Sequence, residues 1–152
     1  MTKYRVLIPD EHYSILEFED ENLPGIAVVN TALKGFEPKE VFCWQLSIII
    51  DLQDLIENGM PSAKEVQVID EFGDYLDKEI KGAEEGKPNA LFLARVTWNS
   101  TRQLIWRVYN PEISHHFLQY IIAENSSPRS FDYRIDKDED WGFTDWYLSE
   151  WK

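Results

Sequence analysis

Hydrophobic and polar residues alternate along residues 89–110, and a period of two is typical of half-buried strands. Two arms rich in β-branched and aromatic residues flank a short polar segment, which predicts a long β-hairpin. Its buried face is expected to combine apolar residues of both arms: Phe92, Ala94, Val96, Trp98, Leu104, Trp106 and Val108. These two sets align only across a loop with an odd number of residues, so we predict the loop Asn99-Ser100-Thr101.

Other segments show strand-like patterns separated by turn residues: 4–8, 12–18, 26–33, 41–52 and 131–136. A Leu-Pro-Gly sequence at residues 23–25 predicts a turn. The segment 41–52 contains three consecutive isoleucines, which indicates a central strand buried on both faces. Cys43 in that segment is interpreted as a packing residue rather than a reactive thiol.

Two longer segments have apolar residues three or four positions apart, the pattern of helices with one buried face. The first follows a capping-box sequence, in which Ser62 and Glu65 are expected to satisfy free backbone amides. It is predicted to end at Gly82. The second begins at Asn110, a cap followed by proline, and continues to about Glu124.

The end of the chain is rich in aromatic residues: Trp141, Phe143, Trp146, Tyr147 and Trp151. We predict that this tail forms a short helix docked on the sheet; the alternative is an exposed segment that binds a partner or a second copy. Together the elements predict a single α+β domain over residues 1–152. We expect an antiparallel sheet, with mixed pairing left open, two main helices packed on one face, and a partly ferredoxin-like arrangement.

The chain is acidic, with 15 basic and 28 acidic residues and a formal net charge of −13. Such a charge repels phosphate backbones, which argues against direct nucleic-acid binding and suits a basic protein partner. The charge is uneven, because residues 10–21 hold six acids and no Lys or Arg. The single cysteine excludes an internal disulfide, and no apolar run has the length of a membrane span or a signal peptide. We therefore expect a cytoplasmic protein that does not contact membranes.

Two groups of residues are candidate binding residues. One is the polar face of the hairpin, Arg95, Arg107 and Tyr109; the other is Trp98, Arg102, Asp138 and Trp141. A purely structural role, with arginines lying along the sheet and pairing with acids, is the alternative. The carboxylates of Asp70, Asp74 and Asp77 share a helix face, where a metal site or a solvated surface is expected. No nucleophile, phosphate-loop or metal-ligand motif is present, so no catalytic residue, cofactor or metal is predicted.

Several short motifs follow one another in a characteristic order. They are the segment from Gly25 to Gly35, Asn58-Gly59-Met60-Pro61 with Glu65, Val96-Thr97-Trp98 with Arg102, Tyr109, and a late Asp138-x-x-Trp141. This order resembles DUF695, a bacterial family of unknown function, over residues 25–148. Members often end with Asp-x-x-Trp-x-x-Tyr; here Thr144 stands where the tyrosine is expected, and Tyr147 follows.

DUF695 modules are sometimes joined to domains similar to the RraB-type regulator of ribonuclease E, an acidic ferredoxin-like inhibitor. The resemblance therefore implies a non-catalytic regulatory role and supplies no catalytic residues. Three functions remain open: a non-enzymatic, inhibitor-like module that binds a basic protein; a small-ligand binder or enzyme with a cleft at the candidate residues; and a self-associating structural protein. The oligomeric state, monomer or homodimer, is also open.

Overall fold

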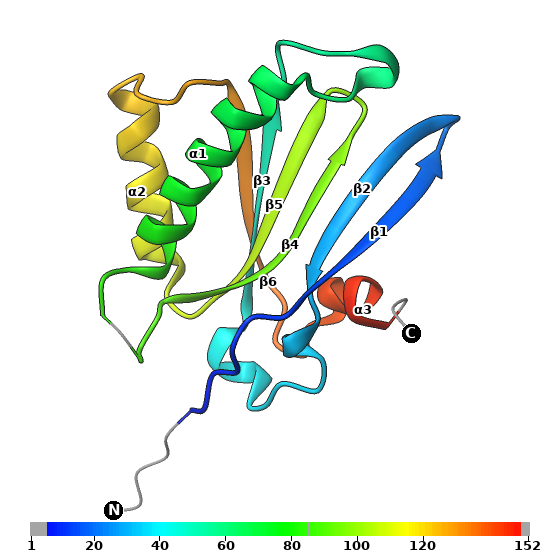
Figure 1. Cartoon of the computed structure of the whole chain (residues 1–152). Helices are drawn as coiled ribbons and strands as arrows, with labels where there is room; N and C mark the ends of the chain where they lie inside the picture. Colours follow the sequence, from blue (N-terminus) through cyan, green and yellow to red (C-terminus); the bar gives the residue numbers. More distant parts are fainter. Residues whose placement is uncertain (1–5, 85, 150–152) are drawn as a thin grey trace, which may run out of the picture.

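The computed structural model describes residues 6–84 and 86–149 as an α+β fold with a six-stranded sheet and three α-helices (Figure 1). The strand order is β1-β2-β4-β5-β3-β6, and every strand pair in these residues is antiparallel, so mixed pairing does not occur there. The strands are β1 (Tyr13–Asp20), β2 (Leu23–Asn30), β3 (Trp44–Asp51), β4 (Ala90–Trp98), β5 (Thr101–Val108) and β6 (Phe131–Lys137). The helices are α1 (Ala63–Lys81), α2 (Pro111–Ala123) and α3 (Gly142–Ser149). Short 3-10 turns are η1 (Thr31–Leu33), η2 (Lys39–Phe42) and η3 (Glu57–Gly59).

Two hydrophobic cores lie on opposite faces of the sheet. The first joins β3 and β5 to buried residues of α1 and α2, among them Ile69, Leu76 and Leu118. The second lies on the other face, where Leu148 of α3 and Trp141 pack on β2, β4 and the segment around η1 and η2. The two main helices, α1 and α2, therefore share one face, and α3, the short docked helix expected in the aromatic tail, packs on the opposite face.

The central hairpin formed by β4 and β5 is present, but its loop has two residues rather than the predicted three. Asn99 and Ser100 both have positive φ, 47° and 66°, as in the tight turns that match the twist of a hairpin. Trp98 therefore pairs with Thr101. The register shifts between Phe92 and Ala94, where the bulge at Leu93 adds one residue to β4.

Because of the shorter loop and the bulge, the predicted set of residues on the apolar face is wrong. Phe92 packs with the first core, as do Leu104, Trp106 and Val108. Ala94 belongs to the second core, and Val96 and Trp98 share its face because side chains alternate along β4. The extra residue reverses the alternation, so that Phe92 and Ala94 face different cores although they are two positions apart.

Some element boundaries also differ from the prediction. Residues 23–25 are the start of β2, and the turn is formed by Glu21 and Asn22, both with positive φ. Pro24 is tolerated because the pairing of β2 with β4 begins only at Gly25, so its missing N–H is not needed there. The predicted first strand, 4–8, is absent over residues 6–8, and its other residues lie outside the described part of the chain.

The helix starts follow the sequence closely. The Ser62 side chain accepts a hydrogen bond from the Glu65 amide at 3.1 Å, and the Asn110 side chain caps α2 in the same way. The other half of the capping box does not form, because the Glu65 carboxylate accepts from the Gln53 amide instead. No helix in residues 6–84 and 86–149 combines the length and apolar character needed to cross a membrane.

Candidate functional site

The predicted site residues separate onto the two faces of the sheet. The two-residue loop aligns Thr97 with Arg102 and Arg95 with Leu104, and so places Arg95 on the α1 side together with Arg102 of β5. Arg107 lies on the α3 side, with Asp138 and Trp141. Neither predicted grouping is assembled, because each drew residues from both faces.

A groove on the α1 side is the candidate binding site. It encloses about 300 Å³, and its walls are formed by residues of α1, β1, β2, β4 and β5. Its lining combines apolar and charged side chains: Tyr13, Ile15, Val28, Ile69, Asp70, Gly73, Asp74, Asp77, Phe92, Arg95, Arg102 and Leu104. The volume is at the small end of the range for ligand pockets and suits one or two side chains.

The groove's two arginines share one carboxylate. The Arg102 guanidinium donates to Asp70 Oδ1 and, through Nε, to Thr97 Oγ1 at 3.1 Å. Arg95 Nη1 lies 3.8 Å from the same Asp70 oxygen and is more exposed. Burial lowers the pKa of Arg102, and repulsion by Arg95 adds to that effect. Asp70 therefore serves to neutralise positive charge in the groove.

A chain of polar contacts closes one end of the groove. The Lys81 ammonium bridges Glu11 and Asp77, at 2.9 Å from each carboxylate. Asp77 also accepts from the indole N–H of Trp106 at 2.8 Å, and Glu11 accepts from the Tyr13 hydroxyl. Burial and this bond to Glu11 raise the pKa of Tyr13 above its usual range. The segment leading into β1 is thereby tied to the end of α1.

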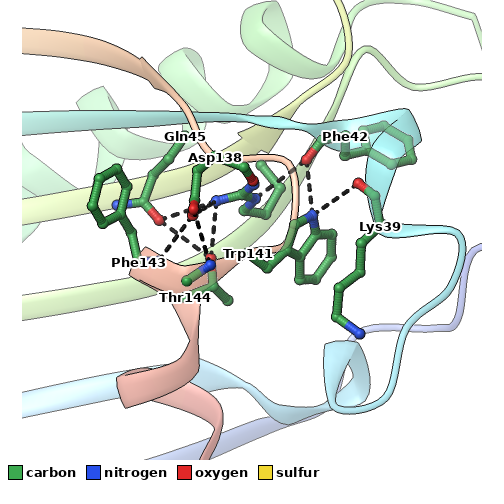
Figure 2. Close-up of polar contacts among 9 residues, drawn as sticks. Lys39, Phe42, Gln45, Asp138, Trp141, Phe143 and Thr144 are labelled. Carbon is green, nitrogen blue, oxygen red and sulfur yellow. Dashed lines mark hydrogen bonds and ion pairs between the residues drawn. The ribbon is translucent and has the colours of Figure 1, made fainter.

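On the opposite face, Arg107 is the centre of a closed cluster. Its side chain has no exposed surface and donates to Asp138 Oδ2 at 2.9 Å and to the Asp138 carbonyl oxygen at 2.6 Å. It also donates to Thr144 Oγ1 at 3.1 Å and to Gln45 Oε1 at 3.3 Å. Asp138 in turn accepts from the Gly142 and Phe143 amides, both at 2.9 Å, and so anchors the start of α3 (Figure 2).

Trp141 completes this cluster. Its indole N–H lies 3.0 Å from the Lys39 carbonyl oxygen and 2.9 Å from that of Phe42 (Figure 2). The ring stacks on Phe36 at 5.4 Å, and the Arg107 guanidinium lies 4.9 Å from its centre. The side chains of Arg107, Thr144 and Trp141 are buried, and their polar groups have protein partners. The Asp-x-x-Trp motif therefore fastens the tail to the sheet.

The remaining predicted residues lie apart from both clusters. The Trp98 indole donates to the Asp20 carbonyl oxygen at 3.1 Å, at the far end of the β1–β2 hairpin. Tyr109 follows β5 and is 61% exposed. His115 contacts the Tyr133 hydroxyl on the surface of α2. Across the described residues, no group of His, Cys, Asp or Glu side chains has the arrangement of a metal site.

The prediction missed several residues that the structure brings together. Gln45 and Thr144 contact Arg107, and Val28 and Tyr13 line the groove. All of them lie far along the chain from their partners. The sequence carries one local signal for the groove, the row of aspartates on α1, which suggested only a metal site or a solvated face.

The fold and the two clusters define a small α+β domain with an open groove on one face and a fastened C-terminal helix on the other. The chain belongs to the DUF695 family, a family of unknown function, whose model matches residues 18–149. The matched region includes the whole groove side of α1 and the Asp138-x-x-Trp141 anchor. Neither the curated proteins nor the solved structures contain a match to this chain.

Proposed function

We propose that this protein is a non-enzymatic regulatory module that binds a basic protein surface, in the manner of an acidic inhibitor. The observation that carries this proposal is the distribution of carboxylates around the groove. Side chains alternate along β1, so Glu17 and Glu19 share the groove face with Ile15. Asp74 of α1 lines the groove, whereas the neighbouring Asp70 is paired with the two arginines. A basic surface would meet carboxylates of both β1 and α1.

The topology supports the same class of function. The elements β3-α1-β4-β5-α2-β6, with strand order β6-β3-β5-β4, are compatible with a ferredoxin-like unit to which the β1–β2 hairpin is added. The resemblance noted in the sequence links this family to an acidic ferredoxin-like inhibitor of a nuclease. A bacterial, cytoplasmic location fits that role and belongs to the proposal.

A salt-dependent partner is the expected result of co-purification. The tagged full-length chain, isolated from its source cells at 50 mM NaCl, should retain a specific basic protein. With both proteins purified, calorimetry should show at least a tenfold rise in Kd between 50 and 300 mM NaCl, because salt screens attraction between exposed charges. Failure to find any partner at low ionic strength would remove the ground for the proposal.

Matched charge reversals locate the surface. The double substitution Glu17→Lys and Glu19→Lys should weaken binding about tenfold or more, since charged rim residues steer association. The control, Glu112→Lys and Glu124→Lys, makes the same change in net charge at exposed positions on and just after α2. It should keep most of the affinity. Equal losses in both variants would show that only the net charge matters, and the groove side would then have no special role.

We further propose that the protein is a monomer. Phe143 and Trp146 are 54% and 53% exposed, and they are the part of the described tail that is available to a second copy. Two half-exposed rings offer far less area than a stable interface needs, and two chains of charge −13 repel each other.

Light scattering should therefore give one monomer mass for the native chain and for the variant Phe143→Ser with Trp146→Ser. Removing the whole tail is a poorer test, because it would also delete the buried Trp141. A dimer mass for the native chain and a monomer mass for the variant would contradict this proposal and support self-association through the tail.

A further inference from the structure

Gly73 is an unusual residue for its place in α1. It lies in the interior of a 19-residue helix, where glycine is less favourable than alanine. A Cβ atom at this position would meet only Leu104 Cδ1, at 3.7 Å, which is an ordinary van der Waals contact. Packing of α1 on the sheet therefore does not require glycine. Its effect is to leave the groove wall without a side chain at position 73, next to Asp74.

The space beside Gly73 has an apolar floor and a charged mouth. Val28, Leu104 and Ile69 line it, while Ile15 is 70% exposed at its side. These contacts suit a long aliphatic stem. At the end of the groove toward Lys81, the Asp77 carboxylate is already engaged by Lys81 and by the Trp106 indole N–H.

The charges favour a cationic occupant. Of the three aspartates in the lining, Asp70 is paired with the arginines and Asp77 with Lys81. Asp74 is exposed, and its side chain has no hydrogen bond or ion pair to another residue of the described chain. Both arginines already face Asp70, and an anion would also meet the carboxylate of Asp74. A carboxylate ligand is therefore disfavoured relative to a guanidinium or an ammonium group.

We infer that the groove beside Gly73 receives one long cationic side chain, arginine or lysine, from the basic partner. The stem lies along Val28 and Leu104, and the charged head pairs with Asp74 at the mouth. This inference rests on the proposed function and deepens it by naming the anchor residue of the partner. Anchoring by one side chain in a desolvated pocket, surrounded by weaker charged contacts, is a common design of protein interfaces.

Capped amino acids test this inference directly. The ¹⁵N-labelled full-length protein is titrated with N-acetyl-arginine methylamide, followed by NMR, with the glutamate and norleucine derivatives as matched anionic and neutral probes. We expect the arginine probe to shift the amides of Ile15, Val28, Gly73 and Asp74, with a Kd on the order of 1 mM, as befits a ligand of that size. The glutamate probe should leave them unchanged.

Three variants separate filling of the groove from damage to the fold. Gly73→Leu should weaken arginine binding at least tenfold, because its side chain occupies the space. Gln67→Leu makes a similar change at an exposed position of α1 outside the groove lining and should bind as the native protein does. Asp74→Asn removes the charge at the mouth without breaking any side-chain hydrogen bond or ion pair among the described residues. It should weaken binding of the arginine probe severalfold and leave binding of the norleucine probe unchanged.

The outcomes also distinguish this inference from the proposed function. Shifts confined to the groove that disappear in Gly73→Leu and weaken in Asp74→Asn support it. Stronger binding of the glutamate probe, shifts elsewhere, or undiminished binding in both variants would overturn it. A basic partner that binds native and Gly73→Leu proteins equally, with a strong salt dependence, would leave the proposed function standing without the anchor. If neither a basic partner nor the arginine probe bound, both the inference and the proposed function would be contradicted.

Discussion

Replacing Asp138 with alanine is expected to lower the free energy of unfolding by about 4 kcal/mol, because the Arg107 guanidinium would stay buried without its carboxylate. Burial already lowers the pKa of Arg107, and Asp138 opposes that shift through a hydrogen bond and charge attraction. The substitution also removes the acceptor for the first amides of α3, at Gly142 and Phe143. Urea denaturation followed by tryptophan fluorescence measures the loss.

Asp136 provides the matched control for this prediction. It pairs with Arg134, whose side chain is 77% exposed, so Asp136→Ala should change stability by no more than about 0.5 kcal/mol. A loss below about 1 kcal/mol for Asp138→Ala would mean that its pair contributes no more than a surface ion pair. The cluster around Trp141 would then have to hold α3 by apolar packing alone.

Replacing Arg129 with methionine is expected to lower the free energy of unfolding at pH 7 by about 3 kcal/mol, since it removes one partner of a buried ion pair. The Glu65 side chain has no exposed surface and accepts from two nitrogens of Arg129. It also accepts from the Gln53 amide at 2.9 Å, which ties the start of α1 to the segment after β3. Without Arg129, a carboxylate would remain in the interior with that amide as its main support.

This second prediction has a definite pH dependence. The hydrogen bonds from Arg129 lower the pKa of Glu65 from 4.5 to about 2, against the opposing effect of burial. A carboxyl group whose pKa is lower in the folded state stabilises the fold above its unfolded pKa. Its contribution is therefore complete above about pH 4.5 and is lost as the pH falls toward 2. The difference between the native protein and Arg129→Met should narrow over that interval.

Unfolding free energies measured at pH 7, 4 and 3 test whether the difference in stability between the native protein and Arg129→Met decreases as the pH falls. Arg134→Met makes the same substitution at an exposed pair and should follow the native protein within about 0.5 kcal/mol at each pH. A gap between native and Arg129→Met proteins that stays constant from pH 7 to pH 3 would show that Glu65 does not carry the stabilisation.

Local signals in the sequence predicted local structure well. Ser62, Gly82 and Asn110 mark the helix ends where the structure has them, because caps act within one turn of their own backbone. Long-range partners were not predictable in the same way. The capping-box glutamate, Glu65, accepts a hydrogen bond from Arg129, 64 positions later in the chain. No local sequence pattern distinguishes this long-range bond from the expected bond to the Ser62 amide.

The hairpin shows why the candidate site could be predicted only in part. Its strands and its central position were evident from their composition, but the bulge at Leu93 left no signature in an apolar run where every residue suits either core. One inserted residue reverses the alternation along β4. The loop, with two residues rather than three, aligns Arg95 with Leu104, so Arg95 faces α1 rather than sharing a face with Arg107. The arginines of the predicted groups therefore divide between a groove and a closed cluster.

The groove itself depends on residues that no single segment reveals. Tyr13 and Val28 come from the added hairpin, while Gly73 comes from a helix whose predicted role was only to bury its apolar face. The aspartates of α1 were recognised, yet their partners were not, because Arg102 reaches Asp70 only after the sheet has aligned.

The position of β1 at the border of the sheet affects how the protein behaves in storage and handling. One side of this strand pairs with β2, and its other side pairs with no strand of the described chain. Such a border attracts further strands, and charged side chains along it are a common means of preventing aggregation. The acidic residues of this strand are Glu17, Glu19 and Asp20. Near the isoelectric point of about 4.5 the net charge of the protein approaches zero, so precipitation by edge-to-edge stacking is expected at that pH.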